Sequence, residues 1–398
     1  MKVAILNVKY SPNLGDGLLA ECLECELRRH HPCIELIPID LAGRTKYDRH
    51  GRHRAAAMRT LEWLPQPLRR AAALTVLSML SRAKLRPAFR MALTSCNAAV
   101  IGGGNLFADD DLNFPVKIAS GLAEARKRAL PVAVHAVGVA DNWSSTGQRL
   151  FTRALGEARI AAIAVRDERS QEIWNRRLGE RGIRPADIAR DPGLLAARCY
   201  TLPENRASRR RVALCITNPL AVRYHGGAAG GDEALGAWYG ATIAALATDG
   251  WEVALFTNGS PEDRAYLDRQ QGSWSKLAAP GTVRAVPAFA RPADLVAELS
   301  QATVVIAHRM HACIAAYSCK VPPIGLRWDP KLDSFFALSD RSDFMVDTAG
   351  VDAAAIVALA NRAAAEGIEP VRHERLLDEA SASIAELGRT LRLAVAAA

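Results

Sequence analysis

Two clusters of polar side chains follow buried apolar runs late in the sequence, and their residue types suit an anionic ligand. The first cluster, His308, Arg309 and His311, comes directly after the apolar run 303–307. The second is Arg-Trp-Asp-Pro-Lys at 327–331, directly after the short apolar run 324–326. Guanidinium groups bind carboxylate and phosphate in a bidentate manner, and imidazole transfers protons near neutral pH. These residues predict a site for a small, multiply anionic ligand with proton transfer beside it.

The elements expected around these clusters would place both of them at one edge of a sheet. The β-branched run 303–307 predicts a buried parallel strand, and a helix of small residues is expected to follow it and to end before Pro322 and Pro323. In open α/β sheets, ligands bind beyond the carboxyl ends of the strands. Both clusters fall at such strand ends.

The same alternation of strand and helix signals extends over the chain and restarts once. Strands are expected at 2–8, 34–40, 98–102, 132–137 and 160–165, and again at 212–217, 251–257 and 283–286. The polar stretch 196–210 between the two sets predicts an interdomain linker. We therefore expect an α/β fold of two Rossmann-like domains facing a cleft, at 1–200 and 210–345, with a basic helical insert at 43–97 and C-terminal helices at 351–398 that pack back on the body.

Candidate binding residues of the first domain also follow strands. Asn13, Gly15 and Asp16 lie in a loop before the helix expected at 18–30, where backbone N–H groups can hold a polar ligand or Asp16 can simply cap the helix. A second group, after the strand at 98–102, is Gly103, Gly104, Asn105 and Asp110. Its glycines allow close approach of the backbone to a ligand, and Asp110 can accept hydrogen bonds from sugar hydroxyls or cap a helix.

Two further features have both a functional and a structural interpretation. Arg166, after the strand at 160–165, can bind an anion or pair with Asp167 or Asp191. Cys22 and Cys25 form a C-x-x-C pair, but they fall inside an expected helix and no second pair follows at ligand spacing. We therefore predict no metal site.

The order and spacing of these motifs resemble the polysaccharide pyruvyl transferase family over residues 3 to about 345. The matching runs are Asn-Leu-Gly-Asp at 13–16, Gly-Gly-Gly-Asn-Leu at 102–106, Arg-Asp-Glu-Arg-Ser at 166–170, Asp-Pro at 191–192, Arg-Met-His at 309–311 and Asp-Pro-Lys at 329–331. The resemblance implies transfer of a pyruvyl group from phosphoenolpyruvate to a sugar. It also implies a fold like that of the two-domain B-type glycosyltransferases, with phosphoenolpyruvate as co-substrate and no other cofactor.

On this hypothesis each candidate residue receives a role. His311 is the general acid/base, Arg309 holds phosphate or carboxylate, and His308 completes the catalytic group. The donor-binding candidates are Arg166, Arg223, Lys331 and Asn218. The acceptor-binding candidates are Asn13, Gly15, Asp16, Gly103, Gly104, Asn105, Asp110 and Asp329.

One position departs from the family pattern. Members commonly carry an arginine just beyond the first strand of the second domain, where this chain has Thr217-Asn218-Pro219. Either Arg223, in an expected mobile loop at 219–232, fills that role, or donor binding differs. Two alternatives therefore stay open: a glycosyltransferase with a nucleotide-sugar donor, and a non-catalytic glycan-binding relative.

The net charge of +9 is concentrated in one segment. Residues 43–97 carry 12 Lys or Arg against Asp48 and Glu62, with leucines at helical spacing. Two or three amphipathic helices are expected, either as a solvated face or as a surface for anionic lipid headgroups or a polyanionic glycan. Aromatic residues are not interleaved with the charges across the protein, which argues against nucleic-acid binding.

Hydropathy and the N-terminal residues indicate the expected cellular location of the protein. No apolar run is long enough to span a membrane, and the N-terminal MKVAILNV lacks a cationic leader region. We expect a cytoplasmic protein, with the inner face of the membrane as an option if the acceptor is a lipid-linked glycan. The sequence leaves open whether the chain forms a homo-oligomer.

Overall fold

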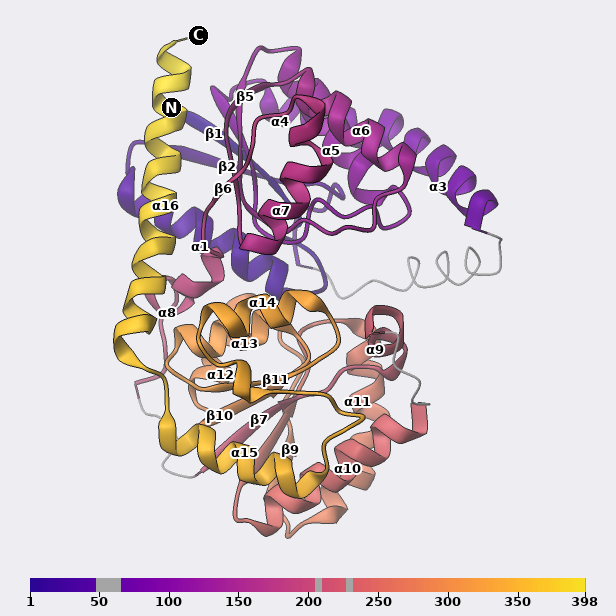
Figure 1. Ribbon diagram of the computed structural model, residues 1–398, viewed down its shortest axis with the longest axis vertical. Helices are drawn as coiled ribbons and strands as arrows, with labels where there is room; N and C mark the ends of the chain where they lie inside the picture. The colour runs from indigo at the N-terminus through magenta and orange to yellow at the C-terminus, as the bar shows by residue number, and fades with distance from the viewer. Residues whose placement is uncertain (48–65, 205–209, 227–231, 398) are drawn as a thin grey trace. The chain divides into compact units, whose positions relative to one another are not determined.

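The computed structural model describes residues 1–47, 66–204, 210–226 and 232–397. Its contacts divide the chain into two compact units, each shown in Figure 1. The first unit consists of Met1–Ser11, Leu19–Pro192 and Glu379–Ala398, and the second of Pro12–Leu18 and Gly193–Asp378. Both the loop before the first helix and the last helix therefore carry the chain from one unit to the other.

The first unit is built on a parallel six-stranded sheet in the order β2-β1-β3-β4-β5-β6. Its strands are almost wholly apolar, and β3 and β4 are buried along their whole length, as expected for a parallel sheet covered on both faces. The strands are β1 (Lys2–Asn7), β2 (Glu35–Asp40), β3 (Ala98–Gly102), β4 (Pro131–Val137), β5 (Arg159–Val165) and β6 (Asp187–Ile188).

The helices that accompany this sheet in the chain are mostly amphipathic. They are α1 (Leu14–His30), α3 (Gln66–Leu80), α4 (Arg86–Leu93), α5 (Asn113–Arg126), α6 (Ser145–Gly156) and α7 (Glu168–Arg177), with a π-helical turn η1 (Ser81–Leu85) between α3 and α4. Short 3-10 turns lie at Gly179–Arg181 and Pro192–Leu195. The buried aromatic side chains Phe107, Phe151 and Trp174 pack together with ring centroids 4.9–5.0 Å apart, so they form one end of the core.

The second unit repeats the architecture with the strand order β12-β11-β10-β7-β8-β9, again all parallel. The order reverses between β7 and β10, which is the topological switch point of the sheet. The strands are β7 (Arg211–Cys215), β8 (Glu252–Phe256), β9 (Val283–Ala285), β10 (Val304–Ala307), β11 (Pro323–Leu326) and β12 (Met345–Val346).

Helices pack on this second sheet as well. Helix α13 contacts β10 and β11, α10 contacts β8, and α15 contacts β10 and β11. The helices are α8 (Ala196–Cys199), α9 (Pro219–Gly226), α10 (Asp232–Thr248), α11 (Pro261–Trp274), α12 (Pro292–Ser300), α13 (Met310–Ser318), α14 (Pro330–Leu338), α15 (Ala353–Glu366) and α16 (Pro370–Ala396), with 3-10 turns at Ser275–Leu277 and Ser342–Phe344.

The predicted α/β fold of two Rossmann-like domains is confirmed, and most strands lie within two residues of their predicted bounds. Helix prediction was less complete. Helix α1 begins at Leu14 and not at residue 18, so Gly15 and Asp16 belong to its first turn. Helix α14 was missed because Asp329-Pro330-Lys331 looked like a break, although proline is well accommodated in the first turn of a helix.

Two predicted loops were also wrong in part. The stretch 219–232 contains α9, and the predicted linker 196–210 contains α8. Residues 227–231 and 205–209 lie outside the described residues, as does 48–65 of the basic segment. Within the part of the chain that the structure describes, no helix combines the length and apolar character needed to cross a membrane.

Candidate active site

The carboxyl edge of the second sheet collects the beginnings of four helices. Strands β11, β10, β7 and β8 are consecutive neighbours in this sheet, and each leads into a helix. The first residues of these helices are Pro219, Pro261, Met310 and Pro330. Helix N-termini present unpaired N–H groups and a positive dipole end. This edge therefore favours a negatively charged ligand.

Arg309 lies at the centre of this edge, as the N-cap residue of α13. Its Nη2 donates to the Asp263 Oδ2, and its Cζ lies 4.8 Å from the centre of the Trp328 ring. The side chain is 16% exposed, and its Nε is buried without a hydrogen bond to any described residue. Arg309 is thus fixed on two sides, by the Asp263 carboxylate and by the Trp328 ring.

Asp263 is the partner that the sequence did not reveal. Its carboxylate is fully buried in the first turn of α11, where Oδ1 accepts from the backbone N–H of Asn218 at 2.8 Å. Burial raises the pKa of the Asp263 carboxyl, and the charge of Arg309 together with the Asn218 N–H opposes that rise. The Ser260-Pro261-Glu262-Asp263 run is a helix-start signal that could have located this residue.

His308 lies one residue before Arg309 and is fully buried. Its Nδ1 is 3.3 Å from the Tyr239 hydroxyl, and its ring packs edge-on against Trp328 with centroids 6.2 Å apart. Burial, and then the charge of Arg309, lower the pKa of His308 to about 3. The enclosed imidazole is therefore neutral near pH 7, and it has no contact with solvent through which to exchange a proton.

His311 is in the first turn of α13 and is only partly buried. A Cβ placed on Gly15 would lie 2.5 Å from His311 Nδ1, so the imidazole packs directly on the Gly15 backbone. The structure thus brings together Gly15, a predicted acceptor residue, and His311, the predicted acid/base. Only a glycine leaves room for this ring position.

Asn13 and the first residue of α1 are held by Asn258, just after β8. Asn258 donates from Nδ2 to Asn13 Oδ1 at 2.6 Å, and its carbonyl accepts from the Leu14 N–H at 2.9 Å. Gly259 has φ +99°, and a Cβ there would collide with the Pro12 carbonyl. Asn258 and Gly259 were not singled out in the sequence, although Asn-Gly after a strand is a turn signal. Asp16 follows in the first turn of α1.

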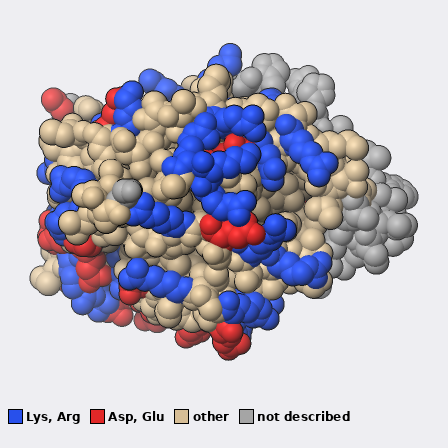
Figure 2. Space-filling view, turned by 90° about the horizontal axis from the view of Figure 1, so that it is seen from above, with Lys and Arg blue, Asp and Glu red and all other residues tan. Residues whose placement is uncertain are grey.

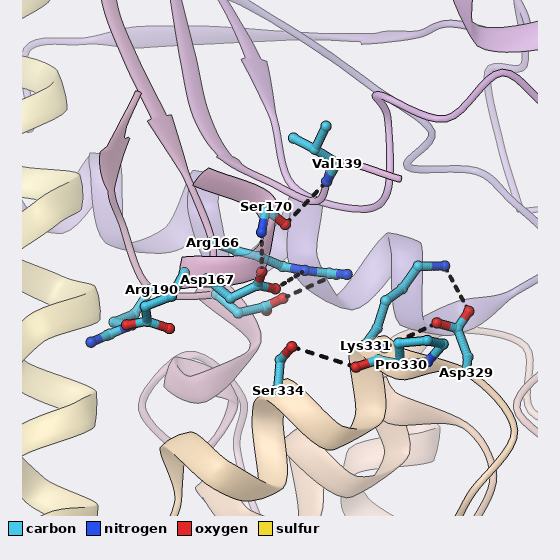
Figure 3. Close-up of polar contacts among 11 residues, drawn as sticks. Val139, Arg166, Asp167, Ser170, Arg190, Asp329, Pro330, Lys331 and Ser334 are labelled. Carbon is cyan, nitrogen blue, oxygen red and sulfur yellow. Dashed lines mark hydrogen bonds and ion pairs between the residues drawn. The ribbon is translucent and has the colours of Figure 1, made fainter. Parts of the chain in front are cut away.

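Three more of the predicted site residues, Asn218, Asp329 and Lys331, make local hydrogen bonds at this edge. Asn218 accepts the Leu220 N–H at 2.9 Å, at the start of α9. Asp329 is the N-cap of α14 and accepts both the Lys331 N–H at 3.0 Å and the Lys331 Nζ at 2.9 Å. Figure 3 shows the Lys331 side chain folded over this cap. Arg223 lies in α9, and its side chain is outside what the structure describes.

In the first unit, Arg166 lies in a buried network and not on the surface (Figure 3). Its Nε donates to Asp167 Oδ2 at 3.1 Å, and its Nη1 lies 4.0 Å from Asp191 Oδ2. Asp167 also caps α7 through Ser170. Both Arg166 Nη2 and Asn105 Oδ1 lie within 3 Å of where a Cβ on Gly138 would stand. This placement favours the structural ion pair that the sequence left open.

The glycine-rich turn after β3 has the backbone that its residues predicted. Gly103 and Gly104 both have positive φ, at +74° and +76°, and their backbone groups bond to β4 and to Gly138. Asp110 is exposed, with φ +44°, and accepts from Asn142 Nδ2 at 3.4 Å. Its neighbour Asp109 is the buried carboxylate, which binds Ser144. Asp110 is thus the exposed carboxylate of this turn, and Asp109 the buried one.

The protein consists of two doubly wound α/β units. Four helices begin at the carboxyl edge of the second sheet, where the partly buried His311 lies two residues after the anchored guanidinium of Arg309. The model of the polysaccharide pyruvyl transferase family matches residues 13–330. The chain belongs to this family, and it is a transferase. No curated protein matches the sequence.

Solved structures show similarity in fold at low sequence identity. A UDP-GlcNAc 2-epimerase from Neisseria meningitidis, bound to UDP-GlcNAc, is 11% identical with a TM-score of 0.57, covering 99% of this chain and 100% of its own. A trehalose-6-phosphate synthase is 11% identical with a TM-score of 0.55, covering 100% and 99%. A putative UDP-N-acetylglucosamine 2-epimerase from Listeria monocytogenes is 9% identical with a TM-score of 0.54, covering 96% and 90%. These similarities concern the fold alone.

Proposed function

We propose that this transferase moves the pyruvyl group of phosphoenolpyruvate onto a sugar of a polysaccharide or of its glycan precursor. The observation that carries the proposal is the arrangement of Arg309, which is anchored by Asp263 and Trp328 and lies two residues before His311 on the first turn of α13. This arrangement joins an anion-binding group to a proton-transfer group at one strand end.

Phosphoenolpyruvate presents a carboxylate and a phosphate, and this edge offers complementary groups. Arg309 supplies its guanidinium, and the N-termini of α13 and α14 supply backbone N–H groups. Lys331 adds a cation when its Nζ turns from Asp329 to the ligand, and Arg223 of α9 is the candidate for the arginine that family members carry after the first strand of this domain. Because Asp263 neutralises Arg309 in part, these additional cations are needed to balance the ligand's charge.

The proposed reaction needs one acid, one base and a leaving phosphate. His311 donates a proton to C3 of the enol, and a sugar hydroxyl forms a bond to C2 while losing its proton. The bond from C2 to the phosphate oxygen breaks, and phosphate leaves. A second hydroxyl of the same sugar then bonds to C2 and loses its proton, which closes the ketal. The two protons released replace the one used at C3 and the one carried by hydrogen phosphate.

Acceptor binding is assigned to the candidates of each unit, which offer backbone groups and carboxylate or amide oxygens to sugar hydroxyls. Gly103, Gly104 and Asn105 offer backbone in a glycine turn, and Asp110 offers an exposed carboxylate. Asn13, Gly15, Asp16 and Asp329 are the candidates in the second unit. The acceptor is a sugar or a lipid-linked glycan, with phosphoenolpyruvate as the co-substrate and no other cofactor in the proposed reaction.

Thermal unfolding with phosphoenolpyruvate tests the donor. A ligand that binds only the folded state stabilises it by about 2.7 kcal/mol at a hundredfold excess over its dissociation constant. We expect Arg309→Lys to weaken phosphoenolpyruvate binding about tenfold or more, because lysine keeps the charge opposite Asp263 but loses the planar fork. Arg327→Lys is the matched control, since Arg327 follows β11 but is exposed and pairs with Asp333.

The outcome separates the donor classes. Stabilisation by phosphoenolpyruvate that Arg309→Lys reduces and Arg327→Lys leaves intact supports the proposal. Stabilisation by a nucleotide sugar, with none by phosphoenolpyruvate, overturns it. If phosphoenolpyruvate stabilises both variants like the parent protein, the donor site lies elsewhere on the chain.

A further inference from the structure

The helices α3 and α4 form one amphipathic run whose outer face no described residue covers. Helix α3 passes into η1 and then α4 without leaving helical backbone, since Leu80 and Arg86 are both in the right-handed helical region. The inner face repeats every four residues as Ser81, Leu85, Phe89 and Leu93, all buried. It is fixed to α5, where Ser81 Oγ lies 2.6 Å from Ser120 Oγ.

The outer face of the same run is apolar and exposed. Val76 is 62% exposed, Met79 64% and Met91 77%. Leu80, Ala83 and Pro87 continue the stripe at three- or four-residue spacing and are exposed too. Of the large apolar side chains that are exposed in the described residues, half lie in this run. A soluble helix normally turns charged residues outward, so this face is suited to an apolar environment.

Cations border the stripe, and carboxylates are excluded from it. Residues 66–97 contain no Asp or Glu, while Arg82, Lys84 and Arg90 are exposed on the run. Arg90 and Lys127 share the buried carboxylate of Glu124, and Arg128 donates to the Arg90 carbonyl, so the basic surface continues beyond α4. Figure 2 shows one face of the molecule, on which Lys and Arg side chains gather around a smaller group of Asp and Glu side chains.

We propose that the outer face of α3, η1 and α4 docks on an anionic lipid bilayer, with Val76, Met79, Leu80 and Met91 in the interface and Arg82, Lys84 and Arg90 at the headgroups. A helix with an apolar stripe and basic flanks lies in the plane of a membrane surface and binds through both features. A soluble polyanion would use the cations but gives no reason for the exposed apolar stripe. This inference goes beyond the proposed function, because binding to a bilayer does not depend on the donor or on the reaction.

Vesicle flotation with the full chain tests the proposal. Vesicles of phosphatidylcholine alone are compared with vesicles that also contain phosphatidylglycerol. We expect the protein to float with the anionic vesicles and to be released as salt is raised. Met79→Glu with Met91→Glu should reduce binding about tenfold or more, and Arg82→Glu with Lys84→Glu about fivefold for each cation removed. All four side chains are exposed, so the variants should unfold at the parent temperature.

The matched control changes the same residue types on the second unit. Lys276→Glu with Leu277→Glu alters an exposed cation and an exposed apolar side chain, and should leave flotation unchanged. A parent protein that stays unbound with anionic vesicles overturns the proposal. So does a Met79→Glu, Met91→Glu variant that floats like the parent, since that assigns the surface to charge alone. A dimer by light scattering that this variant dissociates would assign the face to a second copy of the chain.

Discussion

At the scale of single residues, Arg309 pairs with a carboxylate, Asp263, that has no other cationic partner among the described residues. Asp263 is fully buried, and its described partners are Arg309, the Asn218 N–H and its own helix cap. Removing one member of a buried ion pair leaves the other charge unpaired away from water, which costs more than the pair itself contributes. A loss of activity after substitution of Arg309 can therefore arise from lost anion binding or from lost stability.

Asp263→Asn separates these two causes. We expect the free energy of unfolding to fall by about 3 kcal/mol, because the guanidinium of Arg309, only 16% exposed, loses its counter-charge. Denaturant unfolding measures the change. Asp333→Asn, at the exposed pair with Arg327, should change stability by less than about 1 kcal/mol. Equal losses in the two variants would contradict the buried-pair argument.

Two buried histidines predict a dependence of stability on pH. Burial lowers the pKa of His308 to about 3 and that of His135 to about 4. Between these values and the unfolded value near 6.5, the unfolded chain binds more protons than the native one. Their contribution is therefore complete above the unfolded pKa and is lost as pH falls through the range toward the folded pKa.

The size of this effect can be measured by substitution. From pH 6.5 to 5 each histidine should remove about 2 kcal/mol from the free energy of unfolding. His308→Gln should flatten the pH dependence over this range compared with the parent protein, whatever its effect at pH 7. Parallel curves for parent and variant would show that His308 does not stay neutral in the folded state.

At the scale of elements, the first turn of α1 and the first turn of α13 determine each other's geometry. Gly15 is helical, and an alanine in a helix is normally favourable by about 1 kcal/mol. Here a Cβ would lie 2.5 Å from Nδ1 and 2.6 Å from Cβ of His311, so the imidazole must move. The position of the proposed acid/base is thus set by an element distant in sequence.

Gly15→Ala should therefore lower stability by about 1–3 kcal/mol and impair turnover more than phosphoenolpyruvate binding. Gly272→Ala is the control, since Gly272 lies in α11 with nothing within 4 Å of its Cβ position. This control should be neutral or stabilising by up to about 1 kcal/mol. Should Gly15→Ala also prove stabilising, His311 would not pack on this backbone.

At the scale of the whole molecule, α16 belongs to both units. Its residues from Glu379 on pack with the first unit, while the preceding part belongs to the second. Ile384, Leu387 and Leu391 are buried, and His31 Nε2 lies 2.8 Å from the Ala385 carbonyl. The C-terminal helix is consequently part of the first unit's core.

Gly388→Ala tests this packing. A Cβ on Gly388 would collide with Cδ2 and Nε2 of His31, so the substitution should cost about 1–3 kcal/mol despite the better helix propensity of alanine. Ala382→Gly in the exposed part of the same helix should cost about 1 kcal/mol through propensity alone. A stabilised Gly388→Ala protein would show that α16 does not seat on His31.

The sequence by itself determined the strands of the two sheets and the family to which the chain belongs. Apolar β-branched runs are local signals, so a strand such as 98–102 could be predicted to the residue. The family motifs likewise located Arg309 and His311 at a strand end. Both results depend only on neighbours along the chain.

Only the tertiary structure decided which residues Arg309 and His311 contact. Asp263 reaches Arg309 across 46 residues, and Asn258 reaches Asn13 across 245. Such contacts follow from the order and register of the strands, which bring the end of β8 beside the end of β7. The same packing leaves His308 fully buried and His311 only partly buried. Hydropathy along the chain does not indicate the order of the strands, because a buried strand has the same sequence pattern wherever it lies in the sheet.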